Sequence, residues 1–281
     1  MTICQRSGQG THIRLRRNPR WRLVCGILLV IASTVSYREI HALEPGQWAV
    51  EWKLNQFQIH SDFKLDSPQM LMDELKAITR DIELLLGEPP SDAPVHIVLF
   101  GSVQEYSRYM KTYFPNLPQR RALFIQDRGP GMLFTHWHEE VTVDLRHEVT
   151  HALLNNSSHH LPLWLDEGLA EYYEVAASQR FEGNIHLQDI LQRSQQGYVP
   201  SLKQLEDMHE QVTFGDSHYR DSWSWIHFLL HRNAETRALL VRYIQDYRSG
   251  TRPLPLSRQL VKSFPDLNRE YQQHFASLNL P

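Results

Sequence analysis

Cysteine is almost absent from this chain of 281 residues, and the two that occur, Cys4 and Cys25, lie near the amino terminus. Residues 43–281 therefore contain no cysteine, which excludes a disulfide framework and any metal site with thiolate ligands from this part of the chain. About 240 residues can bury a core that folds without disulfides or a structural metal. A metal bound by these residues would thus serve function rather than folding.

Acidic residues are missing from the first 38 positions. Residues 1–42 hold seven arginines and one acid, a net charge of +6, and include the apolar run Leu23–Val35. A basic stretch before an apolar run too short to span a bilayer comfortably is typical of a secretory signal. We expect residues 1–42 to be a signal peptide or an N-terminal membrane anchor through residues 23–35. The protein would then be exported, and be periplasmic, extracellular or held at the membrane.

The charge of the remaining residues bears on the binding partner. Because the whole chain carries −3 and residues 1–42 carry +6, residues 43–281 carry −9. An acidic surface argues against nucleic acid as a partner.

Hydrophobic periodicity changes along the chain. Before residue 141 the pattern predicts strands mixed with helices: extended segments at 47–63, 95–100, 122–126 and 132–138, and helices at 67–86 and 103–113. After residue 173 it predicts helices only: 185–195, 201–208, 217–231, 234–247 and 266–278. The sequence therefore predicts an α+β fold, with a small mixed sheet first and a mostly helical second half.

The segment Leu145–Tyr173, LRHEVTHALLNNSSHHLPLWLDEGLAEYY, joins these two parts. His147 and His151 lie four residues apart on a helix expected at 141–155, so both imidazoles leave the same face and can converge on one metal ion. Glu148 lies between them.

A catalytic zinc ion takes three protein ligands, from nitrogen and carboxylate donors, and leaves the fourth position to water. Glu167, on a second helix expected at 163–175, can supply the carboxylate if a short connection folds that helix back on the first. Gly168 and Ala170 are small enough to let the two helices approach closely. His159 or His160 remains an alternative third ligand.

The two motifs together, HEVTHALL and LPLWLDEGLAEYYE, resemble those of the gluzincin metallopeptidases, most closely the bacterial peptidase MA-like domain. The specific match covers about thirty residues. This resemblance implies that His147, His151 and Glu167 bind a single catalytic Zn²⁺ and that Glu148 is the general base. It also implies that Glu171 orients His147. Asp166, just before the third ligand, either braces the two helices or faces solvent.

The resemblance also implies a fold and a function. The fold would be zincin-like, with an α/β part at 43–155, a helical part at 156–281 and a cleft between them. The function would be that of an exported zinc-dependent peptidase, which hydrolyses peptide or protein substrates with zinc-activated water. Two alternatives stay open: a catalytically silent, zinc-containing cell-envelope binding or assembly module, and an amidase acting on cell-wall peptides.

Groups that would contact the substrate are less well defined by the sequence. Tyr219 begins a helix in the C-terminal half and is the first candidate for the donor that stabilises the oxyanion, with His218, Arg220 and His227 as alternatives. The extended segment 132–138 directly precedes the helix expected at 141–155, which carries His147 and His151. We therefore expect the segment to be an edge strand that pairs with substrate. His136 and His138 share one face of it and could line the cleft.

Overall fold

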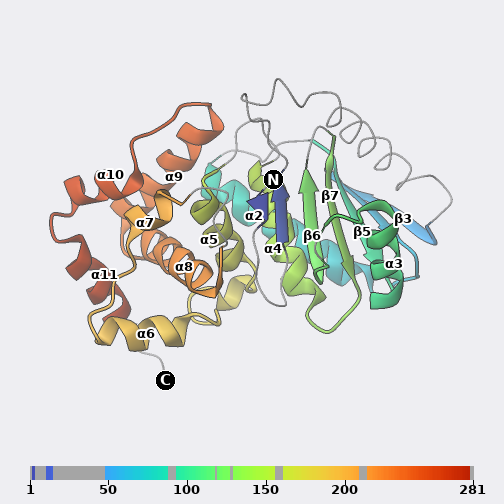
Figure 1. The fold of residues 1–281 in the computed structure, drawn as a ribbon, viewed down its shortest axis with the longest axis horizontal. Helices are drawn as coiled ribbons and strands as arrows, with labels where there is room; N and C mark the ends of the chain where they lie inside the picture. Colours follow the sequence, from blue (N-terminus) through green and yellow to red (C-terminus); the bar gives the residue numbers. More distant parts are fainter. Residues whose placement is uncertain are drawn as a thin grey trace.

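The computed structural model describes residues 2–3, 11–14, 48–87, 93–117, 119–126, 129–155, 161–208 and 214–278. The apolar run at 23–35 and the two alternative ligands, His159 and His160, lie outside these residues. Figure 1 shows a sheet-containing half and a helical half, with two helices meeting between them. Within the described residues, no helix combines the length and the apolar character needed to cross a membrane.

Five strands form the body of a mixed sheet. Their order is β3 (Val50–Leu54), β4 (Phe57–Ser61), β5 (Val95–Phe100), β7 (Gly131–His136) and β6 (Ala122–Gln126). The pairs β4·β5 and β5·β7 are parallel, whereas β3·β4 and β6·β7 are antiparallel. Two short strands, β1 (Thr2–Ile3) and β2 (Thr11–Arg14), extend the sheet beyond β6, with β2 parallel to β6.

Strand β7 is an interior strand, so the prediction that residues 132–138 form the sheet edge is wrong. The reason lies in the hairpin: β6 folds back on the outer side of β7, which leaves β7 hydrogen-bonded on both sides and buried along its whole length. The outer side of β6 carries β2. If residues 1–42 are a signal peptide that is removed, which is one of the two predicted alternatives, β6 becomes the edge strand of the described sheet.

Alternating side chains along the strands build two cores, one on each face of the sheet. Ile97 and Phe124 point to the face covered by α4 (Val141–Asn155), against which α2 (Pro68–Leu86) packs. Val98 and Phe134 point to the other face, which α3 (Val103–Tyr113) covers. The predicted ranges match α2, α3, α4, β5 and β6 closely. The extended segment predicted at 47–63 is instead two antiparallel strands, β3 and β4.

The helical half begins with α5 (Leu163–Tyr173), which contacts α4 on one side and α8 on the other. The remaining elements are a 3₁₀ turn (Ala177–Gln179), α6 (Leu187–Gln195), α7 (Leu202–Glu206), α8 (Asp216–His231), α9 (Ala234–Arg248), α10 (Leu256–Ser263) and α11 (Leu267–Ala276). The predicted α+β class, with the helical half after α4, is confirmed. Helix α10 was not predicted, because its eight residues contribute only Leu256 and Leu260 to the core.

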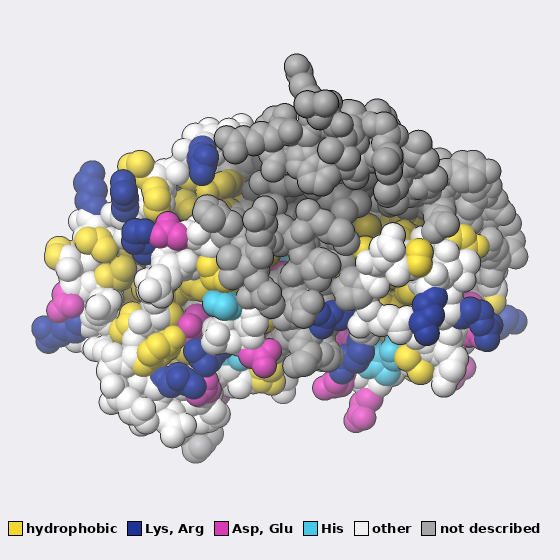
Figure 2. Space-filling view, viewed as in Figure 1, with side chains coloured by type: hydrophobic (Ala, Val, Ile, Leu, Met, Phe, Trp, Pro, Cys, Tyr) yellow, Lys and Arg dark blue, Asp and Glu magenta, His cyan; other side chains and the backbone are white. Residues whose placement is uncertain are grey.

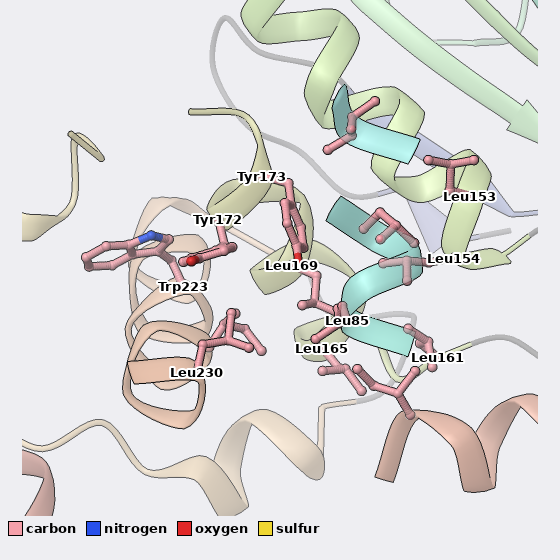
Figure 3. Packing of buried hydrophobic residues seen from close by; sticks show 14 of the residues in the cluster. Leu85, Leu153, Leu154, Leu161, Leu165, Leu169, Tyr172, Tyr173, Trp223 and Leu230 are labelled. Atoms are coloured by element: carbon pink, nitrogen blue, oxygen red, sulfur yellow. The ribbon is translucent and has the colours of Figure 1, made fainter. Parts of the chain in front are cut away.

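Helix α5 is enclosed by its neighbours. Figure 3 shows Leu165, Leu169 and Tyr172 of α5 between the leucines of α4 and the side chains of α8. Every residue from Trp164 to Tyr173 is buried. A helix buried on all sides normally carries apolar residues all round, yet α5 carries three acids. These buried carboxylates need partners inside the protein.

Candidate metal centre

His147, His151 and Glu167 come together between α4 and α5. Oε2 of Glu167 lies 3.7 Å from Nε2 of His147 and 3.6 Å from Nε2 of His151. One ligand atom from each of the three residues lies within 4.8 Å of the other two, and all three side chains are buried. The structure thus brings together the three residues that the motifs predicted as ligands.

This set of atoms fits a bound cation. Nε2 of His147 and both carboxylate oxygens of Glu167 are buried and have no hydrogen-bond partner among the described residues. Unpaired buried polar atoms are rare in native proteins, and a bound ion is one explanation for them. Two imidazole nitrogens and one carboxylate form the donor set of a catalytic zinc site. The residues present therefore fit Zn²⁺.

A carboxylate holds the other ring nitrogen of each histidine. Oδ1 of Asp166 lies 3.2 Å from Nδ1 of His151, and Oε2 of Glu174 lies 3.1 Å from Nδ1 of His147. Such a carboxylate keeps the proton on Nδ1, so that the Nε2 lone pair is directed at the metal position. Asp166 is fully buried, so it does not face solvent, and it pairs with a residue of the neighbouring helix α4.

The carboxylate that holds His147 is Glu174, and the predicted pairing of His147 with Glu171 is corrected. Oε2 of Glu171 instead pairs with Nε2 of His186, at 3.0 Å. Helix α5 folds back along α4 in the opposite direction. The last residues of α4 therefore face the first residues of α5, and earlier residues of α4 face later residues of α5. His151 therefore faces the start of α5 and His147 faces its end. Glu174 lies seven residues after Glu167, on the same helical face, and that spacing is the signal that could have identified it.

Glu148 lies on the same turn of α4 as His147, with its side chain fully buried. Its Oε2 accepts a hydrogen bond of 3.0 Å from the main-chain N–H of Phe124 in β6. Its Oε1 is buried without a hydrogen-bond partner among the described residues. Burial raises the pKa of Glu148 to about 7, against the opposing effect of the two nearby histidines. A carboxyl group with this pKa can both accept and return a proton near neutral pH.

Carboxylates also set the charge state of the two histidines. Burial alone would lower the pKa of His147, but the nearby carboxylates of Glu167 and Glu174 raise it well above its ordinary value. Burial likewise opposes protonation of His151, but Asp166 and Glu167 raise its pKa. The centre therefore favours positive charge, which a divalent cation would supply.

Tyr219 is fully buried near the start of α8, where its ring packs edge-on against Phe214 at 4.9 Å between centroids. Its role as oxyanion donor stays a prediction.

The three alternatives to Tyr219 are each held by other groups. His218 caps α8, Arg220 is ion-paired, and His227 lies in a buried histidine pair. Their partners are the Gly215 N–H for His218, Asp189 and Asp221 for Arg220, and the Phe181 carbonyl and His274 for His227.

His136 and His138 lie together at the start of α4, with ring centroids 4.8 Å apart. Nε2 of His138 lies 3.1 Å from Oδ2 of Asp144. Neither histidine belongs to the set of three ligands, and their place in a cleft stays a prediction. The described residues also form a hollow of about 950 Å³ between α6 and α11, whose lining includes none of the metal-centre residues.

Comparison with known proteins gives distant structural likenesses and no match in sequence. No family model matches the chain, and no curated protein matches it. Among solved structures, an M1 zinc metallopeptidase from Deinococcus radiodurans is similar, with a TM-score of 0.37 and 17% identity over 83% of this chain. The chain covers 52% of that structure. The function must therefore be argued from the residues of the metal centre.

Proposed function

We propose that this protein is an exported zinc-dependent peptidase that hydrolyses peptide bonds. One observation carries the proposal: three buried ligand atoms converge on one point, and a buried carboxylate with a free oxygen, that of Glu148, lies beside them. The exported location rests on the basic and apolar pattern of residues 1–42.

His147, His151 and Glu167 would hold the zinc ion, with Asp166 and Glu174 fixing the two imidazole rings. When bound, zinc supplies a Lewis acid that polarises a carbonyl and lowers the pKa of water to near 7. The carboxylates on both Nδ1 atoms keep the histidines in the tautomer that binds a metal through Nε2.

Glu148 would move the protons. The N–H of Phe124 holds Oε2, which leaves Oε1 free to accept a proton from the attacking water. The same oxygen would then deliver this proton to the nitrogen of the leaving amine. Because burial brings the pKa of Glu148 to about 7, both transfers are accessible near neutral pH.

Strand β6 is the best candidate for the strand that binds the substrate main chain. The N–H of Phe124 is used by Glu148, which places this part of β6 beside the metal centre. An extended peptide could add to the outer side of β6 once β2 is absent, and main-chain pairing of this kind requires little sequence preference. On the face shown in Figure 2, charged side chains of both signs lie over both halves of the molecule.

The test is a measurement of zinc content together with chelator-sensitive cleavage of a peptide library. The parent protein is compared with Glu148→Gln, whose amide oxygen can still accept the hydrogen bond from Phe124. We expect one zinc ion per chain in both proteins and cleavage only by the parent. Cleavage by the Gln variant would remove Glu148 from the role of base.

The same experiment separates the alternatives. Bound zinc without cleavage of any substrate would support the binding or assembly module. Cleavage confined to cell-wall peptides, in a panel that contains both kinds of substrate, would support the amidase. A parent protein that binds no zinc would refute all three functions.

A further inference from the structure

His186 comes from the segment before α6, far in sequence from both motifs, but its ring reaches α5. Its Nε2 lies 3.0 Å from Oε2 of Glu171, and its side chain is largely buried. Asn184 fixes this segment to the same residue of α5: its Nδ2 donates to the Glu171 carbonyl at 2.8 Å, and its Oδ1 accepts from the His186 N–H at 2.9 Å. His186 is therefore held on Glu171 by two further hydrogen bonds.

Two carboxylates lie near the ring of His147. Glu171 lies in the last turn of α5 and Glu174 directly follows the helix, and a carboxylate oxygen of each lies within 4.8 Å of a ring nitrogen of His147. In the structure Glu174 takes Nδ1, at 3.1 Å. A buried carboxylate that loses its partner is strongly destabilising. Glu171 therefore needs a donor of its own, and His186 is one.

We propose that His186 is a positioning residue of the metal centre, which engages Glu171 and so leaves Glu174 as the carboxylate that orients His147. This inference rests on the proposed zinc site. Without His186, Glu171 gains by turning toward Nδ1 of His147. The ring of His147 then shifts, and its Nε2 no longer meets those of His151 and Glu167 at the same point.

The experiment measures zinc affinity by competition with a chromophoric chelator and the visible spectrum of the Co²⁺-substituted protein, which reports ligand geometry. His186→Leu should weaken zinc binding by about 10- to 100-fold and change the Co²⁺ spectrum. His186→Gln, whose amide nitrogen can take the place of Nε2, should restore both values. The double variant Glu171→Met with His186→Leu should also restore them, because replacing both buried partners by apolar groups removes the competing acid.

A matched control lies on the next residue of the same helix. The hydroxyl of Tyr172 pairs with Nε2 of His231 at 2.8 Å, on the α8 side of α5. Tyr172→Phe should therefore leave zinc affinity and the Co²⁺ spectrum unchanged.

Two results would overturn the inference. The first is parent-like affinity and spectrum in His186→Leu. The second is a double variant as weak as His186→Leu, because the loss would then come from packing and not from Glu171. If His186→Leu does not fold, the Gln and double variants still decide the question. If the parent itself binds no metal, the proposed function fails instead.

Discussion

The main-chain N–H of Phe124 donates to Oε2 of Glu148 across 3.0 Å, which ties the expected general base to the backbone of β6. A side chain alone would leave this carboxylate several rotamers. The hydrogen bond selects one of them and leaves the unpaired Oε1 for the reaction. The sheet therefore positions Glu148, the proposed base, and also packs against α4.

Glu148→Asp tests this positional role. The shorter side chain keeps an acid but withdraws it by about one C–C bond length, so it cannot both reach the Phe124 N–H and attend the reaction. A misplacement of about 1 Å can cost on the order of 10² in rate. We expect kcat to fall by this factor in steady-state assays while zinc content stays at the parent level. An Asp variant with parent-like kcat would show that the contact with β6 is dispensable.

Glu167→Ala tests the third ligand. The substitution leaves two histidines, which bind zinc far more weakly than three ligands do. We expect elemental analysis after dialysis to find much less than the parent amount of zinc. Asp73→Ala, an exposed acid on α2, is the control and should retain all of it. Undiminished zinc in Glu167→Ala would place the third ligand elsewhere, with His159 or His160 as the next residues to replace.

Tyr219→Phe tests the predicted oxyanion donor. The substitution removes only the hydroxyl and keeps the ring against Phe214. Loss of one such donor typically lowers kcat by about 10²-fold. We expect this decrease with little change in the denaturant midpoint, measured on the same preparation. Unaltered turnover would assign the ring to the core alone and point to another donor.

Much of this architecture could be predicted from local pattern. The spacing of Leu71, Leu75, Ile78 and Ile82 defines α2, and the continuous apolar run Val95–Phe100 defines a buried strand. The convergence of the candidate metal ligands could also be predicted, because a spacing of four on a helix brings His147 and His151 to one face whatever surrounds them. These features depend on residues close together in the chain.

The remaining features depend on how distant segments meet. Strand β7 lies inside the sheet because it pairs with β5 on one side and with β6 on the other. The sequence of β7 alone does not predict these partners. Whether Glu171 or Glu174 reaches His147 depends on the register of α5 against α4. The contact of His186 with Glu171 depends on the segment before α6, which follows the second motif in the chain and packs back against α5. Periodicity carries no information on such contacts.

Gly168→Ala tests the packing of α5 against α8. A Cβ at this position would lie 2.9 Å from the main-chain oxygen of Ser222 and from Cγ1 of Ile226. Overpacking of a tight core typically costs 1–3 kcal/mol, roughly, in the free energy of unfolding. Because α5 carries Glu167, we also expect weaker zinc binding. Gly215→Ala, at a site with open space, is the control and should change neither denaturant unfolding nor zinc affinity.

The buried pair of His227 and His274 predicts a loss of stability in acid. The carbonyl of Phe181 can only accept, so Nε2 of His227 carries the proton and Nδ1 accepts from Nε2 of His274, at 2.9 Å. Burial, then the nearby histidines, lowers the pKa of His227 to about 3. Burial, followed by His231 and Arg232, lowers that of His274 to about 4. Both rings are therefore neutral in the folded protein at neutral pH.

In the unfolded chain, histidine titrates near pH 6.5. Between about pH 6.5 and 4 the unfolded state binds protons that the folded state does not, so the free energy of unfolding falls as the pH is lowered. His274→Gln keeps a donor near Nε2 but cannot titrate. Between pH 7.5 and pH 5 it should lose about 2 kcal/mol less stability than the parent. Urea unfolding in the presence of a chelator measures this difference without a contribution from metal release, and equal losses in both proteins would show that His274 is protonated in the folded state.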